Sequence, residues 1–393
     1  MKNKNIVSYV IAILVVACVA SLLTFSFVND SVNKRIENAV AAEKSYYNNL
    51  LKDLDILCDV KDIVDQRFVG DVDYSKIDEQ LAEYYVELLN DKYSEYLTKQ
   101  EMESYMNQLD GNVVGIGVYV SNKDGKIFID KVVEGSPAQL GGIVAGESIV
   151  AVNGVEVNNE NIVQVADSIG GRENTDVLLK IEGVDGSIRE VTLTRKAIAV
   201  ETVYGEMLEG NIGYISISRF SANTYESFKK NLDELLKKGA KGLVFDVRDN
   251  PGGEINAIFN VLDRLLPAGP VVNIVYGDGT KKVLNSTDKE SLSLPMAVLI
   301  NKDTASAAEL FASALRDYNM AKLYGNTTYG KGYMQNIITL PNGGGLRISV
   351  AEYNPPYGEN YEGVGVAPHY EVSDDVNTEA DEQLEEALKY FVN

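Results

Sequence analysis

Two residues far apart in the sequence have the chemistry of a nucleophile and a base. Ser306 follows a stretch that predicts a strand and opens a predicted helix, so its hydroxyl would lie near the free amides of the helix N-terminus, which stabilise negative charge. Lys331 stands between two glycines, where the backbone can approach another segment closely. A neutral lysine amine can take the proton of a serine. Gln335 is four residues on, shares a face with Lys331 and could hold the amine in place.

Each residue also has a plain structural explanation. Lys331 can act as a base only if its pKa falls from about 10.4 to about 7, which requires burial that removes about 4–5 kcal/mol of charge stabilisation. An isolated lysine in a glycine turn is more often a surface residue. Ser306 and Glu309 form the S-x-x-E pattern of a helix capping box, which is a common structural device.

A glycine-rich turn could supply hydrogen-bond donors to an oxyanion. Residues 246–253 read DVRDNPGG and link a predicted buried strand to a predicted helix, and glycine amides at such a turn can point at an anion. Taken alone, the segment is an ordinary strand–helix turn. Together, the three segments contain the nucleophile, base and oxyanion donors of acyl transfer, although their spacing does not show that they meet.

The composition excludes several classes of protein. The 393 residues include 58 Asp and Glu against 36 Lys and Arg, which gives a net charge of −22. Duplex nucleic acid needs clustered Lys and Arg, so we expect no nucleic-acid partner. The single histidine, His369, excludes multi-histidine metal sites, and two cysteines are too few for a Cys-rich zinc site. We expect no metal and no cofactor, and a Ser–His–Asp site would have to use His369.

The N-terminus has the pattern of a membrane signal. Lys2 and Lys4 precede residues 6–28, which run 23 residues without a charge, enough for a helix of roughly 30 Å that crosses a bilayer. Basic residues ahead of the apolar run predict a cytoplasmic N-terminus with the rest of the chain outside. We favour a signal anchor over a cleaved signal peptide, whose apolar region is usually roughly 7–15 residues, and over a lipoprotein with a lipobox ending at Cys18.

The periodicity changes twice along the chain. Residues 31–110 predict helices, with Leu81, Tyr84, Tyr85, Leu88 and Leu89 at helical spacing on a packing face. Residues 111–197 predict short strands at 113–120, 127–132, 148–152, 177–181 and 188–193, with a short helix at 162–169. From residue 198 on, strands and helices alternate, which is typical of a layered α/β core, and an amphipathic helix closes the chain.

Three motifs resemble those of the carboxyl-terminal processing peptidases, the tail-specific proteases of family S41. Residues 244–253 resemble L-D-L-R-x-N-P-G-G, residues 304–309 resemble S-A-S-A-S-E, and residues 328–335 resemble T-F-G-K-G-x-x-Q. Residues 353–359 match the family's Y-Y-T-P-x-G-R only loosely. The resemblance implies Ser306 as nucleophile, Lys331 as general base and Gln335 as its orienter. It implies an oxyanion hole from the Ala307 amide and one from Gly252 or Gly253.

The middle region resembles a PDZ domain. Gly115, Ile116, Gly117 and Val118 look like its carboxylate-binding loop, and residues 135–138 and 145–154 look like the turn and strand that follow. PDZ domains add a peptide as a strand and hold its terminal carboxylate with backbone amides. The resemblance implies that this region binds the apolar C-terminus of a substrate.

The sequence therefore predicts an α+β multidomain protein. We expect a signal anchor at 1–30, an N-terminal helical region at 31–110, a PDZ-like β domain at 111–197, and at 198–393 a layered protease core, crotonase- or ClpP-like by resemblance, with a C-terminal helix. The predicted function is that of a bacterial, single-pass membrane serine endopeptidase, active outside the cytoplasm on proteins recognised by their C-termini. Alternatives are a catalytically silent PDZ scaffold and a Ser–His hydrolase. The tyrosine- and leucine-rich helices motivate a homodimer.

Overall fold

The computed structural model describes residues 52–123, 126–158, 160–287, 291–373 and 380–392, and in addition residues 34–35, 38, 40–42 and 44–46. The predicted anchor at 1–30 lies outside the described residues. No helix that the structure describes combines the length and the apolar character needed to span a membrane. The chain divides into two compact units, residues 1–77 and 78–393.

The first unit contains helices with exposed apolar side chains. The short helix η1 (Lys52–Leu54) leads into α2 (Asp55–Arg67), and α3 (Tyr74–Glu87) begins in this unit and continues into the second. On α2, Ile56, Val60 and Ile63 are each more than half exposed. The predicted helical region also contains a strand, β1 (Glu95–Leu97), before α4 (Lys99–Leu109).

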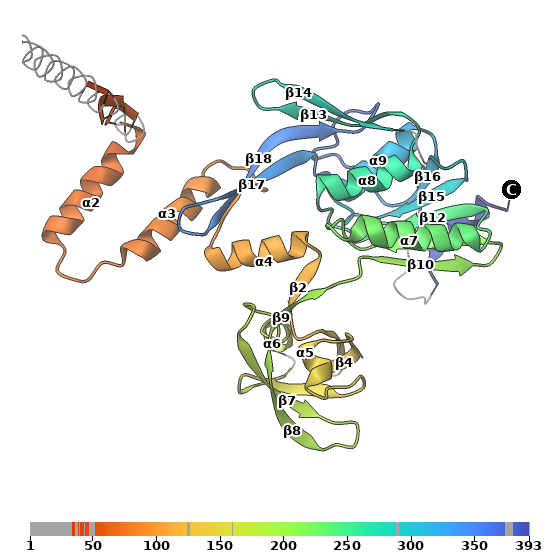
Figure 1. The fold of residues 1–393 in the computed structure, drawn as a ribbon, viewed down its shortest axis with the longest axis horizontal. Coiled ribbons are helices and arrows are strands. Elements are labelled where there is room, and N and C mark those ends of the chain that lie inside the picture. Colours follow the sequence, from red (N-terminus) through yellow and green to blue (C-terminus); the bar gives the residue numbers. More distant parts are fainter. Residues whose placement is uncertain are drawn as a thin grey trace, which may run out of the picture. The chain divides into compact units, whose positions relative to one another are not determined.

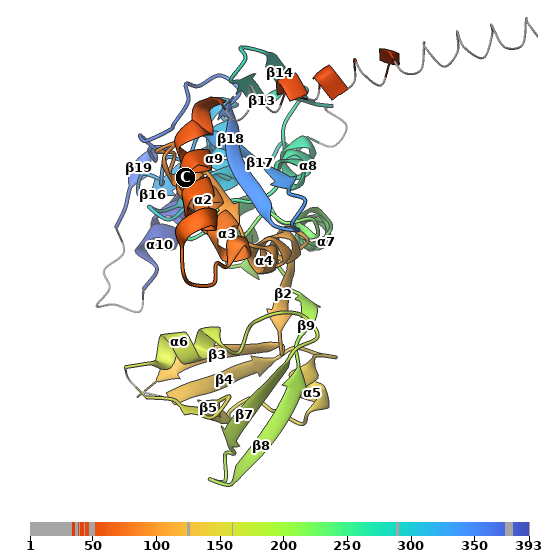
Figure 2. The ribbon, with the colours of Figure 1, turned by 90° about the vertical axis from the view of Figure 1, so that its left-hand side faces the viewer.

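The middle region of the second unit is a twisted antiparallel sheet flanked by two short helices (Figure 2). Its strand order is β3 (Val118–Lys123), β4 (Lys126–Val132), β5 (Ser148–Val152), β7 (Asp176–Glu182) and β8 (Ile188–Thr194), with β6 (Val155–Glu156) on β5. The helices are α5 (Pro137–Leu140) and α6 (Ile162–Asp167), and β2 (Asn112–Gly115) pairs separately with β9 (Lys196–Ala199).

One strand prediction in this region is wrong. Residues 113–120 do not form a single strand, because β2 ends at Gly115 and β3 begins at Val118. Gly117 has a φ of 81°, a left-handed conformation that breaks the extended backbone. The break places the predicted PDZ loop between two strands that belong to different sheets.

The last region of the chain is built on a six-stranded sheet (Figure 1). Its order is β10 (Val203–Leu208), β11 (Ile212–Ile217), β12 (Gly242–Asp246), β15 (Met296–Ile300), β16 (Ala321–Gly325) and β19 (Tyr370–Glu371). All neighbours from β11 onward are parallel, and β10 is antiparallel to β11. Every residue of β12 and β15 is buried, as expected for parallel strands with both faces covered.

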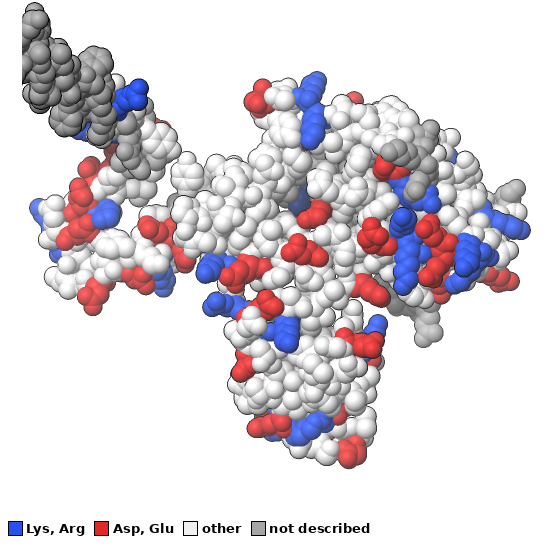
Figure 3. Space-filling view, in the orientation of Figure 1, with Lys and Arg blue, Asp and Glu red and all other residues white. Residues whose placement is uncertain are grey.

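Two sets of helices cover the two faces of this sheet. Leu243 and Phe245 of β12 pack in one core cluster with α7 (Thr224–Lys237), α8 (Ile255–Leu265) and α9 (Ala307–Asp317). Val244, between them on the strand, packs toward α10 (Glu382–Lys389) in a second cluster, as the alternation of strand side chains requires. Acidic and basic side chains are intermixed on the outward side of α7 (Figure 3), while Phe228 and Leu232 face the core.

A second sheet packs against α8 and α9 on the side away from the first sheet (Figure 1). Its order is β1, β18 (Gly345–Asn354), β13 (Gly269–Tyr276) and β14 (Lys281–Ser286), and β17 (Tyr333–Thr339) also pairs with β18. The helices therefore lie between two sheets, and segments from both sheets reach the N-terminal end of α9. The α+β class and the layered core are as predicted.

Candidate active site

The loops after β12 and β15 are joined side by side at the carboxyl edge of the parallel sheet. The Val247 amide donates to the Leu299 carbonyl at 3.1 Å, and the Ala305 amide donates to the Asn250 carbonyl at 2.9 Å. The Thr304 hydroxyl donates to the Val247 carbonyl at 2.8 Å. Neighbouring parallel strands end at the same edge, so the glycine-rich turn and the segment of Ser306, distant in sequence, are brought together.

Ser306 occupies a strained backbone conformation at the start of α9. Its φ is 57° and its ψ is −119°. This backbone conformation costs a non-glycine residue on the order of 1–3 kcal/mol, and residues that adopt such conformations cluster at functional sites. The Ser306 amide donates to Glu309 Oε2 at 2.8 Å. Its hydroxyl oxygen accepts a hydrogen bond of 2.8 Å from Tyr353 Oη. The amide is thus held by a carboxylate while the hydroxyl faces a phenol.

Glu309 connects the serine segment to the lysine segment. Its side chain is fully buried. Beyond the Ser306 amide, Glu309 accepts hydrogen bonds from the Gly330 amide at 2.6 Å, the Lys331 amide at 2.8 Å and the Thr328 hydroxyl at 2.5 Å. Burial raises the pKa of Glu309 above its usual value, and these hydrogen bonds oppose the increase. The predicted capping residue is therefore also the junction that fixes the two loops relative to each other.

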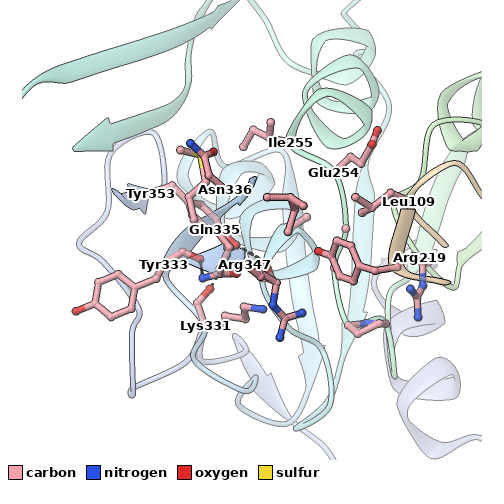
Figure 4. Close-up of a pocket in the computed structure, with 18 of the residues that line it drawn as sticks. Leu109, Arg219, Glu254, Ile255, Lys331, Tyr333, Gln335, Asn336, Arg347 and Tyr353 are labelled. Carbon is pink, nitrogen blue, oxygen red and sulfur yellow. Dashed lines mark hydrogen bonds between the residues drawn. The ribbon is translucent and has the colours of Figure 1, made fainter. Parts of the chain in front are cut away.

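Lys331 is partly buried in the same cavity as Ser306. Burial lowers the pKa of the Lys331 amine below its usual value, and the positive charge of Arg347 lowers it further. Lys331 Nζ lies 4.9 Å from the centroid of the Tyr93 ring. Within the described part of the chain, no hydrogen bond joins Lys331 Nζ to Ser306 Oγ. Both residues line a cavity of about 450 Å³ (Figure 4).

Gln335 lines this cavity but is bonded elsewhere. Its amide nitrogen donates to the Tyr333 carbonyl at 2.8 Å and to Ser349 Oγ at 3.2 Å. No hydrogen bond between Gln335 and Lys331 is present among the described residues. Lys331 precedes β17, and the pairing of β17 with β18 shifts register between Met334 and Gln335, so a simple four-residue periodicity does not describe this segment.

The glycine-rich turn lies against the first residues of α9. A Cβ built on Gly252 would lie 2.8 Å from the Ala307 nitrogen, so only glycine permits this approach. The Gly252 amide donates to Asn250 Oδ1 at 2.8 Å. The Gly253 amide donates no hydrogen bond to any residue that the structure describes. Ala307 is the first residue of α9, where helix amides lack intrahelical partners.

His369 lies outside this cavity. Its Nδ1 accepts a hydrogen bond of 3.0 Å from the Leu323 amide, and its own amide donates to the Leu323 carbonyl at 2.9 Å. Burial lowers the pKa of His369, so the neutral acceptor form is favoured. The imidazole thus pairs with the backbone of β16, which gives it a structural position.

The predicted PDZ loop borders a second cavity, of about 290 Å³. The cavity is mainly apolar and is lined by residues 113–120 together with Val133, Ala166, Ile169, Gly170, Ile198 and Val200. The side chain of Ile116 is buried, and its carbonyl accepts from the Ala138 amide at 2.9 Å. β3 is an edge strand of its sheet beside this groove, so its backbone can accept another strand.

Comparison with known proteins identifies the family. Residues 211–372 match peptidase family S41, and residues 128–183 match a PDZ domain. The carboxy-terminal processing protease CtpA of Bacillus subtilis (strain 168) is 31% identical over 357 residues, which cover 91% of this chain and 75% of that protein. The chain belongs to the carboxy-terminal processing proteases of family S41. The predicted family, the serine-type protease class and the PDZ domain are confirmed.

Other relatives agree with this placement. The probable CtpA-like serine protease of Staphylococcus aureus (strain COL) is 29% identical over 371 residues, covering 94% of this chain and 72% of that protein. The solved photosystem II D1 C-terminal processing protease matches with a TM-score of 0.50 and 26% identity, covering 78% of this chain and 84% of its own. This S41 protease is therefore similar in fold to a C-terminal processing protease of known structure.

Proposed function

We propose that this S41 protease is a membrane-anchored endopeptidase in which Ser306 is the nucleophile and Lys331 the general base. One observation carries the proposal: the backbone amides of Ser306 and Lys331 both donate hydrogen bonds to Glu309 Oε2. Both residues line the same cavity, and the pKa of the Lys331 amine is lowered there. A desolvated amine is the form of lysine that can accept a proton near neutral pH.

The proposed reaction is acyl transfer to Ser306. Neutral Lys331 takes the proton as Ser306 Oγ attacks the peptide carbonyl, and the amides of Ala307 and Gly253 receive the oxyanion. Gly253 is proposed because the Gly252 amide is already bonded to Asn250. The C–N bond then breaks, and protonated Lys331 gives its proton to the leaving amine. Water, activated by Lys331, hydrolyses the acyl-enzyme and regenerates Ser306.

Gln335 is proposed to orient Lys331 during this reaction. The Gln335 amide faces the same cavity, and its bond to Ser349 Oγ is long at 3.2 Å. The side chain would leave Ser349 when substrate enters and donate or accept a hydrogen bond near the lysine amine.

Substrates are proposed to bind through their C-termini in the PDZ groove. The amides of Gly115, Ile116, Gly117 and Val118 would hold the terminal carboxylate, and the apolar cavity would take the side chain of the last residue. The peptide would extend the sheet by pairing with the edge strand β3. The apolar lining favours an apolar C-terminal residue.

Location and assembly are inferred from the sequence and from exposed helices. We propose domains at 1–30, 31–110, 111–197 and 198–393, with the first as a single-pass anchor and the rest outside the cytoplasm of a bacterium. A homodimer is proposed through the helical region. Five apolar side chains of α3 and the residues after it are between 43% and 63% exposed, namely Leu81, Tyr84, Tyr85, Leu88 and Leu89.

The deciding experiment is cleavage of an unstructured protein that ends in apolar residues, by the full chain in detergent and by Ser306→Ala. We expect cleavage by the unaltered chain only, and slower cleavage of the same substrate when it ends in Asp-Asp. Equal cleavage by both chains would overturn the serine mechanism. Binding of the substrate without cleavage by either folded chain would instead indicate the PDZ scaffold.

A further inference from the structure

Tyr353 is a buried tyrosine whose hydroxyl touches the oxygen of Ser306. Its side chain is 3% exposed and it lies near the end of β18. Its Oη donates to Ser306 Oγ at 2.8 Å and lies 3.3 Å from the carbonyl oxygen of Lys331. One phenol therefore contacts both segments to which the proposed nucleophile and base belong, from the cavity that Figure 4 shows.

The position of the phenol is fixed by the surrounding structure. The Tyr353 amide donates to the Gly332 carbonyl at 3.0 Å, and Tyr353 pairs with Ile274 of β13 on the other side of its strand. Its ring packs edge-to-face on Tyr361, with centroids 6.0 Å apart and an interplanar angle of 86°. Such a ring has little freedom to turn, so the hydroxyl is preorganised toward Ser306.

We propose that Tyr353 is a further catalytic residue, which donates a hydrogen bond to Ser306 Oγ while the serine transfers its proton to Lys331. The inference rests on the proposed function of Ser306. A serine hydroxyl has one hydrogen and two lone pairs. The hydrogen of Tyr353 occupies one lone pair, which leaves the hydrogen of Ser306 for Lys331 and the second lone pair for the peptide carbonyl.

The contribution of Tyr353 follows from where charge develops. As the O–H bond of Ser306 breaks, negative charge grows on Oγ, and a hydrogen bond to a charged acceptor is about twice as strong as one to a neutral acceptor. The charge moves to the carbonyl oxygen once the C–O bond has formed, and it returns to Oγ when water expels the serine from the acyl-enzyme. Tyr353 can therefore assist both steps without losing its own proton.

The phenol remains a donor throughout. Burial raises the pKa of Tyr353 far above its usual value. The neighbouring Tyr361 has a different role, because its hydroxyl donates to the main-chain carbonyl of Ser306 at 3.4 Å and not to the reacting oxygen. The two buried tyrosines thus hold Ser306 at two atoms, and only Tyr353 contacts the atom that changes charge.

The test is Tyr353→Phe in the full chain, which removes the hydroxyl and keeps the ring. The matched control is Tyr324→Phe, since Tyr324 is also 3% exposed but packs in the cluster that faces α10. Two rates are measured. One is cleavage of a fluorogenic peptide, resolved into kcat and KM, and the other is covalent modification of Ser306 by a fluorophosphonate. Both are normalised to the folded fraction measured by near-ultraviolet circular dichroism.

We expect Tyr353→Phe to lower kcat and the modification rate by about 100-fold, as when one donor to a developing oxyanion is removed. KM should stay within about twofold, and Tyr324→Phe should match the unaltered chain in both rates. Rates of Tyr353→Phe within about twofold of the unaltered chain, or faster, would overturn the proposal and leave Tyr353 as a packing residue. An unaltered chain that neither cleaves peptide nor reacts with the fluorophosphonate would overturn the proposed function of Ser306 and, with it, the role of Tyr353.

Discussion

The two cavities of this S41 protease are built in different ways. The cavity at Ser306 gathers side chains from α4, the turn before α8, the start of α9, and the strands β17 and β18. The PDZ groove takes most of its lining from one continuous stretch, residues 113–120. The first cavity depends on buried polar groups that must satisfy one another, whereas the second depends on backbone shape and apolar side chains.

This difference predicts how each site fails. A buried carboxylate or amine costs free energy unless its partners are in place, so single polar substitutions at the Ser306 cavity should have large effects. A groove lined by backbone and apolar groups contains no buried charged group that a substitution could leave unpaired. Its affinity for a peptide should therefore change mainly when a glycine with a left-handed backbone is replaced.

Lys331→Met should separate activity from stability. We expect cleavage to fall at least about 1,000-fold, because Lys331 is the proposed general base. We expect the thermal midpoint at pH 7 to rise by a few degrees, because a partly buried charge of lowered pKa beside Arg347 is replaced by an apolar side chain.

This difference in stability should depend on pH, because the folded chain binds fewer protons at Lys331 than the unfolded chain does. The stability difference should therefore shrink as the pH rises toward about 10.4, the ordinary pKa of lysine. A lower thermal midpoint for Lys331→Met would contradict the inference that burial destabilises the charged amine of Lys331.

Glu309→Gln should damage both activity and folding. The glutamine amide nitrogen would face donors that now point at a carboxylate, among them the amides of Ser306 and Lys331. We expect kcat to fall about 100-fold and the free energy of unfolding to fall by about 2–3 kcal/mol. Glu226→Gln on the exposed side of α7 is the control, measured by peptide cleavage and urea unfolding. An active, stable Glu309→Gln would show that the junction is dispensable.

The pH dependence of the unaltered chain should follow Lys331. In the proposed mechanism the neutral amine is the active form, so kcat/KM should rise about tenfold per pH unit up to the pKa of Lys331 and then level off. Because burial lowers that pKa, the plateau should begin below about 10.4. Initial rates on a peptide whose only titratable group is its C-terminal carboxylate provide the measurement. A profile that is flat across this range would contradict the role of Lys331.

Gly117→Ala should weaken peptide binding by the PDZ groove and leave the Ser306 cavity unchanged. Gly117 has a φ of 81°, and an added Cβ would lie 2.3 Å from Ser136 Cβ. We expect affinity for a peptide with an apolar C-terminus to fall about tenfold, measured by fluorescence anisotropy with the Ser306→Ala background. Gly115→Ala should lower the affinity for the peptide less, because a Cβ added at Gly115 would meet nothing within 4 Å. Equal losses at the two glycines would argue against a shape-determined loop.

His369→Ala should have the smallest effect on catalysis. His369 accepts from the Leu323 amide and does not line the Ser306 cavity. We expect kcat within about twofold and a loss of about 1–3 kcal/mol in the free energy of unfolding, because the buried amide loses its acceptor. A fall in kcat as large as that of Ser306→Ala would restore the Ser–His alternative.

Much of the framework could be predicted from the sequence because it depends on local signals. β5 at Ser148–Val152 has the predicted bounds, and the strands predicted at 127–132 and 188–193 lie within one residue of β4 and β8. Alternating and helical apolar patterns determine such elements directly. The prediction of a single strand at 113–120 is wrong because Gly117 breaks it. The left-handed backbone of Gly117 lies against Ser136 from another segment, and the local pattern does not encode this contact.

The sequence by itself determined the candidates for the chemistry of this protein, because Ser306, Lys331 and the glycine turn lie in short, contiguous motifs. Only the tertiary structure decided how they are held together. Glu309 joins two loops across 22 residues, and Tyr353 reaches Ser306 across 47. These contacts follow from the packing of two sheets around α8 and α9, and no local pattern encodes them, since each involves side chains brought together only by the folded core.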